Sequence, residues 1–152
     1  MAPQIAKTLI VEAKNNDLDP LFLLAVIQTE SHFNPKAFGT KGDSGLMQIM
    51  PSTGAWLARR LKIKAPVDLF DPIINIKLGA AHLGHLRKHF GPMGNRYLAA
   101  YNMGTKTVHR LLSQDIEPLA YAQRVVENYN AFHTALIEAV REDRRTLISS
   151  ND

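Results

Sequence analysis

The sequence predicts one compact, mainly α-helical domain, and three observations support this prediction. No segment shows the period-two alternation of apolar and polar residues that marks a half-buried strand. An aspartate followed by a proline, which is typical of a helix start, occurs at Asp19-Pro20 and again at Asp71-Pro72. The length of 152 residues, of which 45% are hydrophobic and 21% are charged, suits a single globular core.

The helices can be placed in chain order from their spacing and end signals. Segment 21–31 is apolar on nearly every side, so we expect it to be the central, buried helix. Glycines between residues 34 and 45 predict an irregular loop. The expected helices cover residues 5–15, 21–31, 46–50, 52–61, 72–90, 95–103 and 105–112, and a last long helix begins near residue 118.

Two of these helices have an apolar face that can be read directly from the spacing. In segment 72–90 the expected core residues are Ile73, Ile76, Ala80 and Leu83. The last helix carries one stripe that consists of Tyr121, Val125, Asn128, Phe132, Leu136 and Ala139. The charged residues from about Arg141 on indicate fraying, so we expect a domain over 1–145 and a frayed tail over 146–152.

Composition excludes several classes of protein. There is no cysteine, which rules out disulfides and thiolate chemistry but does not fix the compartment. The longest apolar runs are too short to cross a bilayer, and the first residues lack a secretory signal. The net charge of +4 suits an anionic polymer, whether nucleic acid, membrane surface or bacterial wall.

Glu30 is the most informative single residue. It lies three and four positions after Ile27 and Val26, on the apolar face of the expected central helix. A carboxyl against an apolar wall resists ionisation, so its pKa rises toward neutrality, as a general acid requires. The alternative is a solvated glutamate at the rim of the helix.

The segment 43–51 follows with residue types that suit a ligand. Gly45 allows a tight turn and lets the backbone approach a ligand closely. Gln48 can exchange hydrogen bonds with sugar hydroxyls or acetamides. Met47 and Met50 supply adaptable apolar surface, although core packing is the alternative for one of them. Asp43 is the only plausible second carboxylate near Glu30.

Taken together, these segments resemble a known family over roughly residues 5–132. Three motifs occur in the family's order. They are Glu30-Ser31 with Phe33-Asn34-Pro35, then Gly45-Leu46-Met47-Gln48-Ile49-Met50-Pro51, and then Ala100-Tyr101-Asn102 with Gly104. Glu117 with Tyr121, Arg124 and Val125 is similar to its closing motif. The family is that of the lytic transglycosylases with a soluble lytic transglycosylase domain, which is goose-type lysozyme-like (glycoside hydrolase family 23).

The resemblance implies a lysozyme-like fold with a substrate groove and an enzyme that cleaves peptidoglycan glycan strands. Glu30 would be the single catalytic acid and then base at the bond between N-acetylmuramic acid and N-acetylglucosamine. The products would carry a 1,6-anhydro ring, and no water, metal or other cofactor would take part. The substrate's own acetamido group would stabilise the cationic intermediate, in place of the second carboxylate that ordinary glycosidases use.

The resemblance also assigns roles to other residues. Tyr101 would hold Glu30 or the substrate acetamido through its hydroxyl, although a buried tyrosine with a satisfied hydroxyl is the alternative. The expected substrate-binding residues are Ser31, Thr40, Gly45, Met47, Gln48, Met50, Asn102, Glu117 and Tyr121. Many members carry a serine where this chain has Gly39, so Thr40 beside it replaces that contact or the contact is absent.

Other functions are compatible with parts of this sequence. A hydrolytic muramidase and a catalytically silent glycan-binding module would share the fold. A nucleic-acid binder would concentrate basic residues on one exposed helix, whereas here they are dispersed, so no nucleic-acid partner is expected. His82, His85 and His89 share one helix face, which predicts a solvated surface rather than a metal site. We expect a monomer in the periplasm or cell envelope, or on a phage particle.

Overall fold

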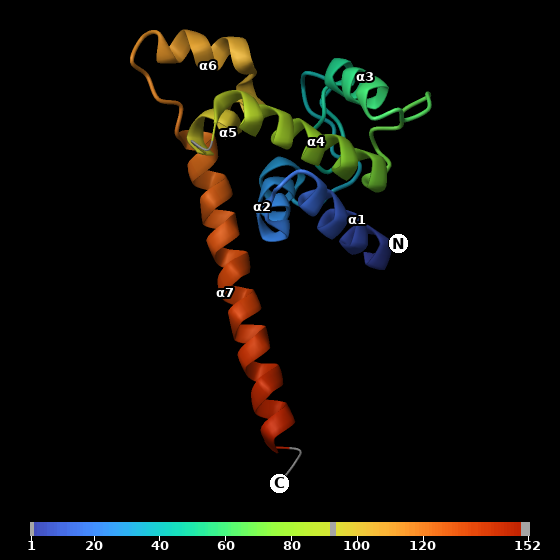
Figure 1. Ribbon diagram of the computed structural model, residues 1–152, viewed down its shortest axis with the longest axis vertical. Coiled ribbons are helices and arrows are strands. Elements are labelled where there is room, and N and C mark those ends of the chain that lie inside the picture. The colour runs from blue at the N-terminus through green and yellow to red at the C-terminus, as the bar shows by residue number, and fades with distance from the viewer. Residues whose placement is uncertain (1, 92–93, 150–152) are drawn as a thin grey trace.

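The computed structural model describes residues 2–91 and 94–149 and confirms the mainly α-helical prediction (Figure 1). Within these ranges the regular elements are seven helices, and the only β-type pairing consists of two isolated bridges at Ser44. The helices are α1 (Ala2–Asn15), α2 (Pro20–Ser31), α3 (Pro51–Arg60), α4 (Pro72–Phe90), α5 (Gly94–Met103), α6 (Thr105–Leu112) and α7 (Ala120–Ser149).

Helix α2 is the central, buried helix that its apolar sequence predicts. The carboxylate of Asp19 accepts a hydrogen bond from the backbone N–H of Leu21 at 2.7 Å and caps the start of the helix. The helix ends at His32, whose left-handed backbone directs its N–H to the carbonyl oxygen of Gln28. The buried side chains of α2 are Leu23, Ala25, Val26, Ile27 and Ser31. Both ends of the helix are therefore fixed, and with them the position of its last turn.

Helix α4 crosses the domain and packs against α1 and α5. Asp71 caps its start by accepting hydrogen bonds from two backbone amides of the first turn. Three of the four predicted core residues, Ile76, Ala80 and Leu83, have no solvent exposure. The fourth, Ile73, is half-buried.

Residues 46–50 form a turn rather than the short helix predicted from the sequence. Gly45 and Gln48 have φ angles of 78° and 46°, which lie in the left-handed region that a right-handed helix excludes. The backbone N–H groups of Ser44 and Ile49 each donate to the other residue's carbonyl oxygen, at 3.1 and 3.0 Å. These amides close the turn across its base and are not available to an α-helix.

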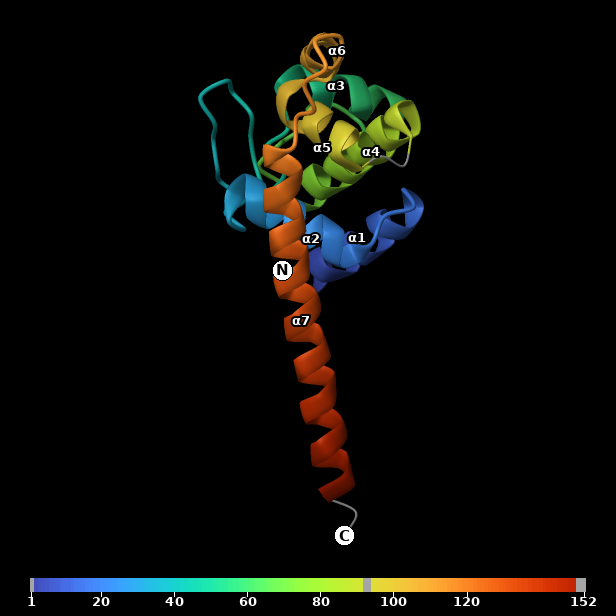
Figure 2. The same cartoon turned by 90° about the vertical axis from the view of Figure 1, so that its left-hand side faces the viewer.

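Helix α7 is 30 residues long, about 45 Å, and its outer part extends beyond the rest of the domain (Figures 1 and 2). Its predicted stripe is buried at Tyr121 and Val125 and half-buried at Phe132. Beyond that point the stripe is not covered: Leu136 is 49% exposed and Ala139 is also exposed, because no other described element packs there. The helix continues through the charged residues from Arg141 to Ser149.

Candidate active site

A cleft of about 410 Å³ opens beside the last turn of α2, and Glu30 lies in its wall. The loop before α3 forms one side of this cleft, and residues of α3, α4 and α5 complete it. The lining residues are Glu30, Thr40, Lys41, Asp43, Gln48, Met50, Thr53, His82, Ala100, Tyr101, Asn102, Met103 and Gly104. Segments that are far apart in the sequence therefore meet around one carboxyl group.

Burial raises the pKa of the Glu30 carboxyl from 4.5 to about 7. A hydrogen bond from Tyr121 opposes this rise, the negative charge of Asp43 adds to it, and the positive charge of Arg124 opposes it. The effect of burial is the largest of the four. The structure therefore confirms the sequence-based expectation that an apolar wall raises this pKa toward neutrality.

Tyr121 is the hydrogen-bond partner of Glu30. Its hydroxyl, at the start of α7, donates to Oε1 of Glu30, and the tyrosine side chain is 3% exposed. The guanidinium carbon of Arg124 lies 5.8 Å from the centre of the Tyr121 ring, close enough for a cation–π interaction. Tyr121 thus fixes the orientation of the carboxyl that faces the cleft.

Asp43 is a second carboxylate in the same cleft, as the sequence suggested. A Cβ placed on Gly39 would lie 1.9 Å from Oδ2 of Asp43, so the carboxylate occupies the space of a side chain at position 39. The backbone N–H of Gly39 donates to the carbonyl oxygen of Asp43 at 2.8 Å and holds the two residues together. The absence of a side chain at Gly39 therefore makes room for a charged group in the cleft.

Asn75 holds the turn that carries Gln48 and Met50. Its Oδ1 accepts a hydrogen bond from the backbone N–H of Met47 at 2.7 Å. Its Nδ2 donates to the carbonyl oxygens of Ser44 and Leu69, at 2.8 and 2.7 Å. Asn75 is fully buried, and it is not among the residues predicted from the sequence. A single amide within the apolar stretch 73–76 was the available signal.

Three of the predicted binding residues support the turn rather than line the cleft. A Cβ on Gly45 would lie 2.2 Å from the carbonyl oxygen of Leu69, so only glycine fits there. Ser31 is buried, and its hydroxyl donates to the carbonyl oxygen of Leu46 at 2.7 Å. Met47 is fully buried, which is the core-packing alternative considered above.

Tyr101 does not make the hydrogen bond to Glu30 that was one of its two predicted roles. Its hydroxyl donates to the carbonyl oxygen of Met47 at 2.8 Å, which uses its only proton. Burial raises the pKa of this hydroxyl well above its usual value. Tyr101 therefore ties α5 to the turn, and its side chain forms part of the cleft wall.

Four of the predicted binding residues do line the cleft, namely Thr40, Gln48, Met50 and Asn102. The side-chain amide of Gln48 donates to the carbonyl oxygens of Ala37 and Gly45, at 3.1 and 2.8 Å, which fixes its orientation. Met50 is 37% exposed, so its thioether is accessible from the cleft.

Two predicted placements are wrong. Glu117 is exposed, lies outside the residues that line the cleft, and forms an ion pair with Arg96 of α5. The sequence could not show this pairing because the two residues are 21 positions apart. His82 does not belong to a solvated histidine face: it is half-buried and lines the cleft, whereas His85 and His89 are exposed. No group of three or more potential metal ligands occurs in the described ranges.

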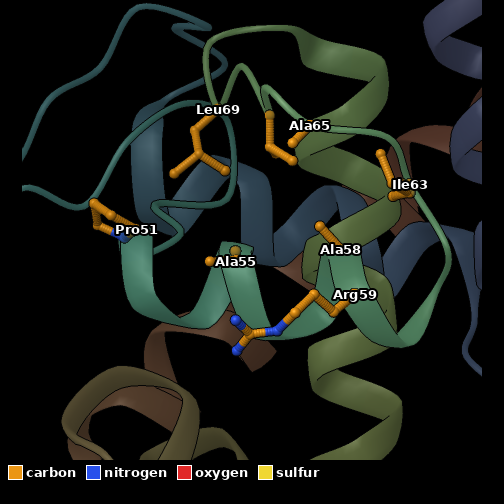
Figure 3. A pocket seen from close by; sticks show the side chains of 9 residues that line it. Pro51, Ala55, Ala58, Arg59, Ile63, Ala65 and Leu69 are labelled. Atoms are coloured by element: carbon orange, nitrogen blue, oxygen red, sulfur yellow. The ribbon is translucent and has the colours of Figure 1, made fainter.

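A second cavity of about 410 Å³ lies between α3 and the segment that leads to α4 (Figure 3). We call it the apolar cavity. Its lining residues are Pro51, Gly54, Ala55, Ala58, Arg59, Ile63, Ala65, Val67 and Leu69. Arg59 is the only charged residue among them.

Comparison with known proteins gives consistent matches. The model of the transglycosylase SLT domain matches residues 7–123. The soluble lytic murein transglycosylase of Escherichia coli is 31% identical over 147 residues, which cover 86% of this chain and 22% of that protein. The membrane-bound lytic murein transglycosylase C of Mannheimia succiniciproducens is 34% identical over 111 residues, which cover 66% of this chain and 31% of that protein.

A solved structure shows the same fold. It is that of an inactive mutant of lytic transglycosylase Slt from Pseudomonas aeruginosa, in which a glutamine replaces a glutamate. It superposes with a TM-score of 0.76 at 30% identity and covers 86% of this chain and 24% of that one. The chain spans less than a third of the length of these relatives. The expected lysozyme-like helical fold is confirmed, and the chain belongs to the family of the transglycosylase SLT domain.

Proposed function

We propose that this chain is the catalytic domain of a peptidoglycan lytic transglycosylase. The observation that carries the proposal is one carboxyl, Glu30, with a pKa of about 7 in the wall of an open cleft. Such a group is present in both protonation states near neutral pH, as a residue that acts first as an acid and then as a base requires. The family of the chain supports the same activity.

The reaction needs only this one residue to transfer the proton. Protonated Glu30 gives its proton to the oxygen between N-acetylmuramic acid and N-acetylglucosamine, and the bond from that oxygen to C1 of the muramoyl residue breaks. The substrate's acetamido oxygen stabilises the positive charge at C1. The carboxylate of Glu30 then takes the proton of the C6 hydroxyl, whose oxygen bonds to C1. A 1,6-anhydro ring forms, no water is consumed, and Glu30 is protonated again.

The other residues bind the sugars, orient the Glu30 carboxyl or support the turn beside the cleft. Tyr121 orients the Glu30 carboxyl through its hydrogen bond. Four side chains of the cleft wall, those of Thr40, Gln48, Met50 and Asn102, contact the sugars on either side of the scissile bond. Lys41 adds a positive charge to the same wall, which suits an anionic polymer. Four further predicted residues keep the turn in place, namely Ser31, Gly45, Met47 and Tyr101.

The products identify the reaction. Purified peptidoglycan digested with this domain should yield muramoyl ends that are one water lighter by mass spectrometry than the ends made by hydrolysis. Ends that are all reducing would instead make the domain a muramidase. Binding of glycan strands with no release of fragments would leave only a glycan-binding module.

The setting that fits this activity is the periplasm or the cell envelope, with the domain acting as a monomer. The names of the relatives include both soluble and membrane-bound lytic murein transglycosylases. In the described ranges, no helix combines the length and the apolar character needed to cross a membrane. Light scattering of the purified domain tests the monomeric state, and fractionation of cells that express the full-length protein tests the location.

A further inference from the structure

The imidazole of His82 stands out because one of its nitrogens has no partner. Its Nδ1 atom is the only buried side-chain polar atom without a hydrogen-bond partner in the part of the chain that the structure describes. Buried polar groups are nearly always paired, so such an atom calls for an explanation. His82 also lines the cleft that contains Glu30.

The position of His82 on α4 explains how it reaches the cleft. Residues 75, 79 and 82 follow each other at spacings of four and three, so they share one face of the helix. On this face Asn75 holds the turn, and Gly79 leaves room for Met47, because a Cβ there would lie 2.3 Å from its sulfur. His82 continues the same face and lies in the cleft wall.

Neighbouring rings hold the imidazole in one orientation. Its centre lies 5.3 Å from the centre of the Tyr101 ring, at an interplanar angle of 43°. On α3, the Trp56 ring lies 6.3 Å away at 80°. The hydroxyl of Tyr101 is in turn fixed by its hydrogen bond to Met47. Because Nδ1 is enclosed and the half-buried ring lines the cleft, we infer that Nε2 is the nitrogen that a ligand in the cleft can reach.

His82 is uncharged under working conditions. Burial, and then the nearby His85, lower the pKa of its imidazole from 6.5 to about 4. A neutral imidazole can donate or accept one hydrogen bond at Nε2, depending on which nitrogen carries the proton. A sugar hydroxyl can pair with either form because it is both a donor and an acceptor.

We propose that His82 is a binding residue for the glycan, with Nε2 hydrogen-bonded to a sugar hydroxyl in the cleft. The inference rests on the proposed function and adds to it a residue that lies outside the motifs that carry the family resemblance. The aromatic neighbours set the ring orientation in advance, so binding does not have to order this side chain. In this orientation Nδ1 has no hydrogen-bond partner, while Nε2 is directed at the ligand.

The direct test is nitrogen NMR of the six histidines in a Glu30→Gln variant, which can bind without turning over. The probe is the tetramer of β-1,4-linked N-acetylglucosamine. We expect a saturable chemical-shift change at Nε2 of His82, with smaller changes at His85 and His89. A His82→Phe spectrum assigns the signal, and this variant should bind the tetramer about 3- to 10-fold more weakly, as the loss of one hydrogen bond predicts.

Steady-state kinetics distinguish a role of His82 in binding the glycan from a role in packing alone. In the active domain, His82→Phe should raise KM about 3- to 10-fold and leave kcat within about twofold, because the contact exists before and during bond cleavage. His85→Phe, one turn away and outside the cleft lining, should change neither. If the tetramer binds and Nε2 of His82 does not respond, the inference is wrong and the proposed function stands. If the tetramer does not bind to the Glu30→Gln variant, both are contradicted.

Discussion

The cleft and the apolar cavity have the same volume, about 410 Å³, but only the cleft contains the chemistry of a glycan-cleaving site. They lie on opposite faces of α3: Thr53 faces the cleft, while Ala55 and Ala58 face the apolar cavity. The cleft contains two carboxylates, Glu30 and Asp43, besides a neutral imidazole. The apolar cavity contains one charged residue and small aliphatic side chains (Figure 3).

The difference shows that volume alone does not identify a functional site. In the cleft, burial shifts the pKa of Glu30 to about 7, and fixed partners such as Tyr121 orient it. In the apolar cavity, no lining residue is a carboxyl, a histidine or a tyrosine that could transfer a proton. Changes to the two cavities should therefore affect catalysis very differently.

The largest expected effect comes from Glu30→Gln, which keeps the shape of the side chain and removes the transferable proton. We expect the rate of glycan cleavage to fall by roughly 10²-fold or more. The release of soluble fragments from purified peptidoglycan measures it. Turnover close to that of the wild type would refute the assignment of Glu30.

The matched control is a change in the apolar cavity. Ala55→Leu partly fills that cavity on the opposite face of α3. We expect its activity to stay within about twofold of the wild type and its stability within about 1 kcal/mol, since the cavity is open to added apolar volume. A large loss of activity in this variant would show that the apolar cavity takes part in the reaction.

A second large effect should follow from Asn75, whose side chain hydrogen-bonds to the turn beside the cleft and to Leu69 in the wall of the apolar cavity. Asn75→Leu removes the side-chain partner of the Met47 amide and of the Leu69 carbonyl oxygen, and it leaves the Ser44 carbonyl oxygen with the N–H of Ile49 alone. We expect a loss of about 3 kcal/mol in the free energy of unfolding, together with reduced activity, because the turn that carries Gln48 is released. Chemical denaturation measures the first effect. Asn130→Ala, at an exposed position of α7, should change stability by less than about 0.5 kcal/mol.

The helices could be predicted because their signals are local. The Asp19 and Asp71 caps each lie next to the helix that they start, and the sequence shows them directly. The turn at 46–50 was mistaken for a helix because its shape depends on Asn75, whose contact with Ser44 spans 31 residues. The exposure of the outer part of α7 could not be predicted, because apolar spacing shows which face of a helix can be covered and not whether another element covers it.

In the candidate site, too, contacts within one helix could be predicted and contacts between distant segments could not. The apolar setting of Glu30 could be predicted because its neighbours lie on the same helix. The hydrogen bond from Tyr121 joins residues 91 positions apart, and no local pattern indicates that this tyrosine, rather than Tyr101, contacts Glu30. The position of His82 in the cleft likewise depends on how α4 packs against α5.

Stability should depend on pH through Glu30. Its pKa is about 7 in the folded protein against an ordinary value of 4.5, so the folded state keeps this proton to higher pH than the unfolded state does. The free energy of unfolding therefore falls as pH rises from 4.5 to about 7. Glu30→Gln removes this loss, so the variant should be more stable than the wild type at pH 8, by at most about 3 kcal/mol, and similar below pH 4.5. Denaturation at both pH values measures the difference, and equal stability at pH 8 would contradict it.

The smallest expected effects are two opposite shifts of the pH–activity profile, which test the electrostatics of the cleft directly. Asp43 raises the pKa of Glu30, so Asp43→Asn should move the alkaline limb of the profile to lower pH. The hydrogen bond from Tyr121 lowers that pKa, so Tyr121→Phe should move the limb to higher pH. Each change removes one polar interaction and nearly preserves the shape of the side chain, which makes the direction of the shift the informative result. Rates measured across the pH range on purified peptidoglycan give both profiles. Shifts in the same direction would mean that a group other than Glu30 controls the alkaline limb.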